Sequence, residues 1–453
     1  MTADTHSVAM LRRDQSWPLP LTIAVVVATI AYLIPAMING FPLVYWDTGG
    51  YLTAGVRDEY VPNRSVYYAW FAEFAGFASA WGVIAVQAAL SAATLAAIVR
   101  MLSPGSTAAT VGALFAGCFT ALPWYASWLM PDVFAGLAIL ATLGLVFGTW
   151  SRWQPAALCL VVIFSLLSHT SHFPLVAATI VGAVIGALLY RARAAWLLPT
   201  GCLAAAVGLT VLAHAALTGH AFFNRTGWVL LFSRLAESGL VQEQLDRRCT
   251  DNPDWSKLCT YRDRIPENAE QWLWQRGTPF WRIGAWEGTR EDSRRIVIDA
   301  VREHPVEAAL FALRGFGKQL TLIELGEGTE SQEWFLAWTI KASFPREFGA
   351  WRRALQQNGE LLPLARAANR AHLPIVLAGL ALTAFGLFAR RLAPRLRAAC
   401  FTVLVAFLAN AFVCGALSGP HDRYQVRLIW VVLATAVPVA AALRQTRYLR
   451  QTR

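Results

Sequence analysis

Long apolar stretches recur along this chain, and they constrain its fold more than any other feature. A helix needs about 20 predominantly apolar residues to cross a bilayer. Ten stretches approach that length: 20–40, 80–99, 107–129, 132–150, 156–172, 174–190, 196–217, 373–389, 398–418 and 425–443. Only 15% of the residues are charged, against about 25% in soluble domains. The sequence therefore predicts an all-α polytopic membrane protein with about ten transmembrane helices.

The basic residues of the short connections predict the orientation of these spans. Threading ten spans with the N-terminus in the cytoplasm places the arginines of the short connections and tails on the cytoplasmic side, among them Arg100, Arg191, Arg390 and Arg444. This distribution follows the positive-inside rule. Anionic lipid then accounts for the net charge of +11, and we expect no nucleic-acid partner. The Arg- and Ala-rich usage suggests a bacterium, so we expect the chain in an inner membrane with both termini cytoplasmic.

The chain divides into three blocks. Residues 1–217 form an N-terminal transmembrane module with outer loops, 218–372 an extracytoplasmic helical domain, and 373–453 the C-terminal spans with a basic cytoplasmic tail. Aromatic residues at helical spacing in 62–80 predict a juxtamembrane helix on the outer leaflet. Cys249 and Cys259 are the two cysteines of the middle block. An oxidising compartment would allow a disulfide between them, and free thiols are the alternative.

Polar clusters from distant parts of the chain fall on the outer side of this topology. Asp47 lies in "FPLVYWDTGGYL", after the first span, and Asp132 lies in "WLMPDVFAGL", between the third and fourth. The remaining outer candidates are His169, His172, Arg225, His421, Asp422 and Arg423, and Arg427 follows in the same last loop. Ionisable groups near a membrane are costly and tend to be functional. We therefore expect these residues to bind a substrate or its carrier.

Each cluster also has a structural interpretation. Asp47 and Asp132 could each cap a helix. His169 and His172 share a helix face at this spacing, but two histidines without a third ligand favour polar packing over a metal site. Asp422 and Arg423 could form a local ion pair. The coincidence of all the clusters on one side favours a shared site.

Arginines and carboxylates at a membrane rim suit one kind of chemistry. Arginine binds phosphate in a bidentate manner, and a carboxylate can take a proton from an acceptor hydroxyl. Together they predict glycosyl transfer from a lipid-phosphate sugar, with Asp47 as the general base. Gly49 and Gly50 allow a tight turn beside it. Trp46 and Tyr51 offer flat faces to a sugar ring, or belong to the interfacial aromatic belt.

The segments "YWDTGGYL" and "MPDVFAGL", with a large outer domain before the last spans, resemble the GT-C superfamily of integral-membrane glycosyltransferases. The resemblance implies a polyprenyl-phosphate-linked sugar donor and a glycan, lipid or protein acceptor at the periplasmic face. It implies that Asp47 is the catalytic first-loop acid. Asp132 matches a second-loop acid that in some members binds the acceptor or a divalent metal such as Mg²⁺ or Mn²⁺. Arg423 matches, loosely, a basic residue that holds the carrier phosphate.

The chain departs from that pattern in two places. Thr48 follows Asp47 where many relatives have a glutamate, and the second loop lacks an Asp-x-Asp motif. We therefore assign no metal or other cofactor from the sequence. Two other functions remain as alternatives: a transporter or flippase of a lipid-linked glycan, and a non-catalytic partner in envelope-polysaccharide assembly. Transporters tend to place polar groups near the bilayer midplane and to contain repeats, and the sequence indicates neither.

Overall fold

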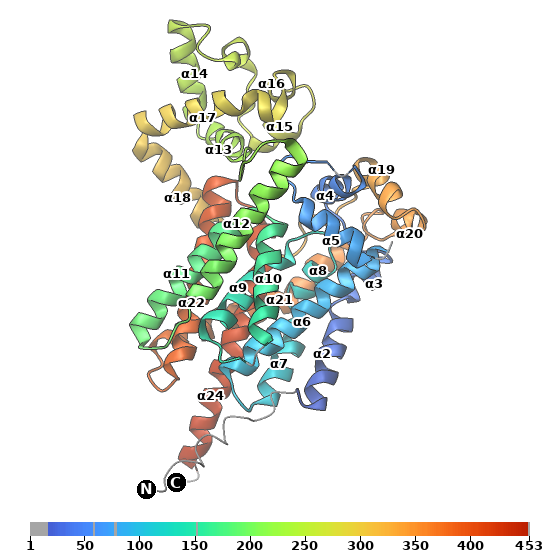
Figure 1. Cartoon of the computed structure of the whole chain (residues 1–453), viewed down its shortest axis with the longest axis vertical. Coiled ribbons are helices and arrows are strands. Elements are labelled where there is room, and N and C mark those ends of the chain that lie inside the picture. The colour runs from blue at the N-terminus through green and yellow to red at the C-terminus, as the bar shows by residue number, and fades with distance from the viewer. Residues whose placement is uncertain (1–16, 58, 77–78, 151–152, 452–453) are drawn as a thin grey trace.

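The computed structural model describes residues 17–57, 59–76, 79–150 and 153–451. Helices make up the regular structure of these ranges, and no strand occurs in them beyond an isolated bridge between Leu43 and Trp128. The prediction of an all-α protein is confirmed. Figure 1 shows a tall helical bundle with a smaller group of helices at one end, which we call the outer end.

Seven segments are long and apolar enough to cross a membrane, so the chain is a multi-pass membrane protein. Five of them are single helices: α6 (Ala80–Leu102), α11 (His172–Tyr190), α12 (Leu197–Thr218), α21 (Leu361–Phe388) and α22 (Pro394–Leu417). The other two are α2 (Leu19–Ala31) with α3 (Ile34–Asn39), and α23 (Asp422–Ile429) with the start of α24 (Leu433–Gln451).

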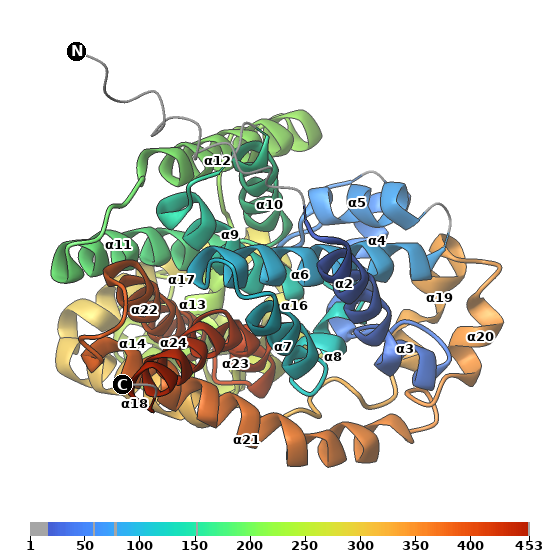
Figure 2. The ribbon, with the colours of Figure 1, turned by 90° about the horizontal axis from the view of Figure 1, so that it is seen from below.

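Seven of the ten predicted spans correspond to long apolar helices, and the other three correspond to shorter apolar helices. The stretch 107–129 is divided between α7 (Thr107–Gly117) and the short α8 (Leu122–Ala126), which begins at a proline-containing turn. The other two are α9 (Val133–Phe147) and α10 (Gln154–Ser168), with 15 residues each. Every residue of α9 is buried, and Figure 2 shows it among α6, α10 and α11. Because protein rather than lipid surrounds α9, its length need not match the bilayer.

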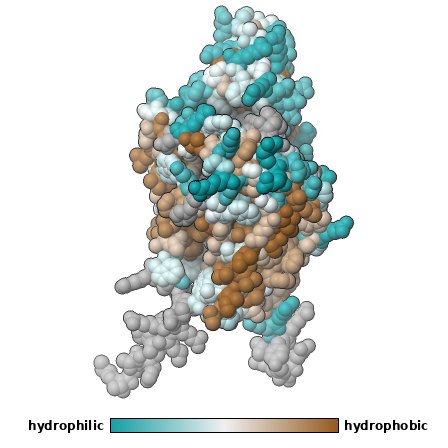
Figure 3. All heavy atoms as spheres, turned by 90° about the vertical axis from the view of Figure 1, so that its right-hand side faces the viewer, coloured by the Kyte–Doolittle hydropathy of each residue, from teal (hydrophilic) through white to brown (hydrophobic). Residues whose placement is uncertain are grey.

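Polar contacts bring the short connections together at the end opposite the outer end. A guanidinium nitrogen of Arg395 donates to the carbonyl of Met101 at 2.8 Å. The N–H of Ala195 donates to the carbonyl of Val146 at 2.9 Å. The expected cytoplasmic N-terminus, 1–16, lies outside the described residues. Figure 3 shows hydrophobic side chains gathered over the bundle half of one face and hydrophilic ones over the outer half.

Residues 227–303 form an outer domain with a core of its own. It contains α13 (Gly227–Ala236), α14 (Leu240–Asp251), the 3₁₀ helix η1 (Lys257–Arg264), α15 (Ala269–Trp274), α16 (Pro279–Arg282) and α17 (Ala285–Glu303). Phe232, Trp272 and Phe280 are fully buried in that core. A disulfide joins Cys249, in α14, to Cys259, in η1. The helix α18 (Pro305–Thr321) then leads back to the bundle and packs on α22.

The rest of the middle block belongs to the main core. Leu325, Ile340 and Trp351 are buried in the same cluster as the spans. The helix α19 (Glu333–Ser343) packs on α4 (Trp46–Arg57), which packs in turn on α5 (Val66–Gly76), and α20 (Phe348–Arg353) follows α19. The predicted juxtamembrane helix thus corresponds to α5, and residues 77–78 of that prediction lie outside the described residues. The block 218–372 therefore contributes to two separate cores.

Candidate functional site

The loop that carries Asp47 is fixed by hydrogen bonds to distant segments. The side chain of Gln356 accepts from the N–H of Val44 at 3.1 Å and donates to its carbonyl at 2.7 Å. The Thr48 hydroxyl accepts from the N–H of Tyr45 at 2.9 Å and donates to the carbonyl of Leu129 at 3.1 Å. These contacts hold the first turn of α4, so Asp47 has a defined position.

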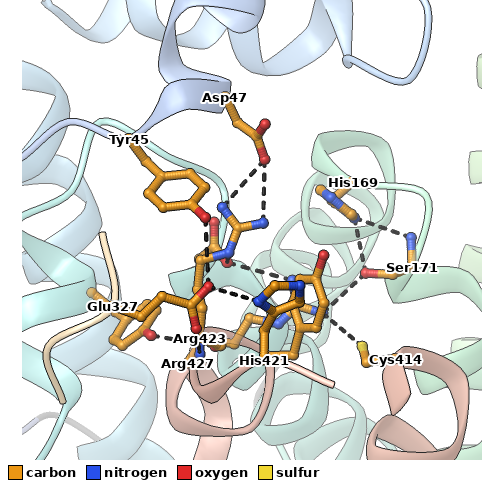
Figure 4. A network of polar contacts seen from close by, with 12 residues as sticks. Tyr45, Asp47, His169, Ser171, Glu327, Cys414, His421, Arg423 and Arg427 are labelled. Atoms are coloured by element: carbon orange, nitrogen blue, oxygen red, sulfur yellow. Dashed lines mark hydrogen bonds and ion pairs between the residues drawn. The ribbon is translucent and has the colours of Figure 1, made fainter. Parts of the chain in front are cut away.

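Two arginines bind the Asp47 carboxylate, and Figure 4 shows one of them, Arg423. Arg64 forms an ion pair with one oxygen, and both terminal nitrogens of Arg423 lie 3.2 Å from the other. A Cβ on Gly50 would lie 2.9 Å from Cγ of Arg64, so the second glycine of "DTGG" leaves room for this arginine. Burial by itself would raise the pKa of Asp47, but the cations of Arg64 and Arg423 outweigh it and lower the pKa. Asp47 is therefore ionised at neutral pH.

Asp132 extends this cluster into the protein interior. Its carboxylate lies 3.5 Å from Arg427 and 3.9 Å from Arg423. The side chains of Asp132 and Arg427 are only 2% and 1% exposed, and that of Arg423 is 7% exposed. Asp132 occupies the N-cap position of α9 but makes no capping hydrogen bond. Its carboxylate therefore forms ion pairs with the arginines and does not cap the helix.

We call Asp47, Arg64, Asp132, Arg423 and Arg427 the outer network. Its members come from α4, the segment before α5, the start of α9 and α23, which are separated by up to about 380 residues of sequence. Asp47, Asp132 and Arg423 all lie at helix N-termini, where the helix dipole favours negative charge. Three cations face two carboxylates within this set, and a third carboxylate, that of Glu327, lies beside it and interacts with Arg423. A phosphate could bind these arginines in exchange for one of the carboxylates.

A histidine and two glutamates lie next to the network. Glu327 accepts a hydrogen bond from the backbone N–H of Arg423 at 2.9 Å. His421 contacts Glu327 at 3.2 Å and, on its other side, Glu270 of the outer domain at 3.4 Å. Burial would lower the pKa of His421, but its hydrogen bond to Glu327 and the charge of that carboxylate raise it overall. For Glu327, burial is in turn outweighed by His421, which lowers the pKa of the glutamate.

Of the two predicted histidines, only His169 reaches the network, through its neighbour Ser171. Arg427 donates to the hydroxyl of Ser171 at 3.1 Å, and the same hydroxyl lies 2.8 Å from Nδ1 of His169. His172 is fully buried, and its Nδ1 lies 2.6 Å from the carbonyl of Ser165. His169 therefore lies at the edge of the network, whereas His172 packs inside the bundle.

The other predicted residues lie around the network rather than in it. Asp422 accepts a hydrogen bond from the backbone N–H of Glu324 at 2.8 Å. The structural alternative, an ion pair of Asp422 with Arg423, is not formed among the described residues, where Arg423 pairs with Asp47 and Asp132. Arg225 lies 3.5 Å from Glu287 of the outer domain. Tyr51 is only 1% exposed, with its ring against Tyr68. Trp46 is half-buried at the start of α4. The face that Tyr51 was expected to offer to a sugar is thus covered by protein.

The donor set does not suit a divalent cation. Asp47 and Asp132, the carboxylates that a metal would need, are both engaged by arginine side chains. Within the described part of the chain, no three His, Cys, Asp or Glu side chains gather as a potential metal site. We therefore derive no catalytic step through a metal.

Three members of this region were not predicted from the sequence. Arg64 lies in a stretch dominated by aromatic residues, Glu327 lies between two glycines in "LGEGT", and Glu270 is one of many charges in the outer domain. Glu327, an acid flanked by glycines, resembles Asp47, which is followed by two glycines in "WDTGG". This local pattern could have identified Glu327 as a candidate site residue. Arg64 and Glu270 have no such local signal, because their importance comes from spatial neighbours.

Comparison of the chain with protein-family models, with curated proteins and with solved structures gives no match.

Proposed function

We propose that this protein is a GT-C-type membrane glycosyltransferase, which moves a sugar from a polyprenyl-phosphate carrier to a hydroxyl of a glycan, lipid or protein at the periplasmic face of a bacterial inner membrane. One observation carries the proposal: Asp47 and Asp132 share a single network with three arginines at the outer end of the bundle. Its position at one end, rather than mid-bundle, supports a transferase over a transporter.

In the proposed step, Asp47 takes the proton of the acceptor hydroxyl. The acceptor oxygen forms a bond to the anomeric carbon of the sugar, and the bond from that carbon to the carrier phosphate breaks. The electron pair of the broken bond leaves on the polyprenyl phosphate, whose negative charge the arginines stabilise. The proton on Asp47 then passes to solvent, which its side chain reaches with 18% exposure.

Because Asp47 forms ion pairs with two arginines, its basicity should depend on whether the sugar donor is bound. While Arg64 and Arg423 both bind the carboxylate, its pKa stays low and it is a weak base. A carrier phosphate that binds one of these arginines would remove a cation from Asp47 and add an anion beside it. Both changes raise the pKa of Asp47 toward the range in which a carboxylate accepts a proton effectively. Proton abstraction is thereby favoured when the donor is present.

The test uses the full-length protein in nanodiscs with a panel of farnesyl-phosphate-linked hexoses and pentoses, and a bacterial lipid extract as acceptor. We expect wild-type protein to release farnesyl phosphate from at least one donor. Asp47→Asn should reduce the release by about 100-fold or more, and Asp254→Asn, an exposed aspartate of the outer domain, should not. Normal release by a folded Asp47→Asn variant would disprove the assignment of the base.

A further inference from the structure

The helix α18 carries an apolar stripe that the described part of the chain leaves uncovered. Val306, Leu310, Leu313 and Leu320 are 63%, 48%, 56% and 37% exposed. They follow one another at spacings of four, three and seven residues, which places them on one face of the helix. The helix is not among the seven candidate spans. A contiguous exposed apolar surface of this kind marks contact with a membrane or with another protein.

The opposite face of α18 is fixed to the bundle and to the outer domain. Gly315 lies against α22, where a Cβ on it would be only 2.3 Å from the carbonyl oxygen of Gly415. Arg234 of the outer domain lies over the ring of Phe311, 4.3 Å from its centre. These contacts fix the rotation of α18 about its own axis. The stripe therefore faces away from the protein.

The stripe adjoins the exposed surface of a span. Phe316 lies three residues from Leu313 and four from Leu320, and its ring packs on Phe412 of α22, with centres 6.2 Å apart. Phe412 and Leu417 are 44% and 42% exposed, in the last turns of this candidate span. Figure 1 shows α18 running obliquely from the outer domain to the outer end of α22. The apolar surface of the span thus continues onto α18.

Basic side chains lie along one edge of the stripe. Arg314 and Lys318 are exposed and one turn apart. The acidic residue of this helix, Glu307, lies in its first turn, at the end farther from α22. An interfacial helix combines such a basic edge, which meets lipid headgroups, with an apolar face that enters the acyl chains by about 5–10 Å. This charge pattern and the continuity with a span favour lipid over a protein partner.

The same helix holds a loop of the candidate site. Gln319 is fully buried, and its side-chain oxygen accepts from the N–H of His421 at 3.0 Å. Its side-chain nitrogen donates to the carbonyl of His421 at 2.7 Å. His421 directly precedes α23, which carries Arg423 and Arg427. The position of α18 is therefore coupled to the start of α23.

We infer that α18 is an interfacial helix, whose apolar stripe lies among the acyl chains of the outer leaflet and whose Arg314 and Lys318 contact lipid phosphates. This contact with the membrane holds Gln319 against the loop at His421. The half of α18 nearer α22 lies deeper in the leaflet than the half nearer the outer domain. The inference does not depend on glycosyl transfer.

The first test measures the surroundings of single nitroxide labels on full-length protein in nanodiscs. Cys118→Ser and Cys159→Ser remove the two free cysteines that are not buried. Labels at Leu313→Cys and Leu320→Cys should favour oxygen over a water-soluble nickel complex at least about 3-fold more than a label at Arg294→Cys does. Arg294 is the aqueous control, because its side chain is 55% exposed on α17 of the outer domain.

Two results of this measurement would overturn the inference. Leu408→Cys, on the exposed surface of α22, gives the value expected in lipid. Labels on α18 that match the Arg294 position instead would show that water covers the stripe. Labels that are shielded from both reagents would show that a second copy of the chain or another protein covers it.

The second test measures the link to the site. Leu310→Gln combined with Leu313→Gln should weaken the membrane contact and speed hydrogen exchange of segment 418–421 about 3-fold or more, because Gln319 is then held less firmly. Val301→Gln is the matched control, since Val301 is a 40% exposed apolar residue of α17. Unchanged exchange in the folded double variant would overturn the coupling between the membrane contact and this loop.

Discussion

Arg423 reaches Asp47 across almost the whole sequence, with both terminal guanidinium nitrogens 3.2 Å from the same carboxylate oxygen. The same guanidinium lies over the ring of Tyr45, 4.1 Å from its centre. One side chain of α23 thus fixes the loop after the first span. The last and the first spans of the chain are coupled through this contact.

Replacement of Arg423 should weaken binding of the sugar donor. We expect Arg423→Ala to raise the KM for a farnesyl-phosphate sugar about 10-fold or more, because a charged hydrogen-bond donor to phosphate is lost. Arg423→Lys should recover part of the loss, since it restores the charge without the two-pronged geometry. Initial rates against donor concentration test this, and an unchanged KM in both variants would refute a phosphate contact.

The buried pair of Asp132 and Arg427 should be strongly coupled in stability. Asp132→Asn leaves Arg427 without its ion-pair partner, and Arg427→Gln leaves Asp132 only the 3.9 Å contact with Arg423. Each should cost about 3–5 kcal/mol. The double variant should cost less than the sum of the two, because no isolated charge then remains. Thermal melting of the purified variants gives the double-mutant cycle. Additive effects would mean that the two side chains do not interact as the 3.5 Å contact indicates.

The contact between His421 and Glu270 should loosen as pH rises. The folded-state pKa of His421 is raised above its ordinary value, about 6.5. Its stabilising contribution is therefore fully present below about pH 6.5 and is lost as pH rises through the folded-state pKa. We expect hydrogen exchange of α15, corrected for the intrinsic rate, to increase over that interval.

Two variants provide the control for this pH dependence. His421→Gln should abolish it, because the amide does not titrate. His304→Gln should preserve it, although His304 forms a similar contact with Glu243 at 3.2 Å inside the outer domain. If the His421→Gln protein retained the wild-type dependence, another group would have to control the docking of α15.

The disulfide should stabilise the outer domain locally. Cys249 and Cys259 are 10 residues apart, and closing so short a loop contributes about 2–4 kcal/mol. Replacing both by alanine should speed tryptic cleavage at Lys257, Arg262 and Arg264, which lie in η1. Cys118→Ala, a free cysteine of the bundle, is the control. Equal cleavage rates would show that the crosslink does not restrain η1.

Local chemistry was enough to predict the class of protein and part of the site. Uninterrupted apolar runs predict spans, because lipid offers backbone groups no hydrogen-bond partners and forces them into helices. Seven predicted runs correspond to long apolar helices. Asp47 and Asp132 were also identified from the sequence, since a carboxylate beside an apolar run is costly and conspicuous.

The spatial arrangement of those residues could not be predicted from local sequence. Three predicted spans correspond to shorter helices, and one of them, α9, is enclosed by protein. Burial by neighbouring helices cannot be read from a hydropathy pattern. Tyr51 was expected to offer a face to a sugar, yet Tyr68 and Arg64 cover it. Arg64 and Glu327 were missed because their roles depend on contacts with Asp47 and His421.

Sequence alone determined that the chain is helical, crosses a membrane several times and places a few charges beside apolar spans, where charges are costly. These properties follow from the transfer free energies of individual side chains. Only the tertiary structure decided which charged side chains form ion pairs with one another. Coulomb energy depends on distance and surroundings, and only the folded chain brings residues 47, 64, 132, 423 and 427 within a few ångströms of each other.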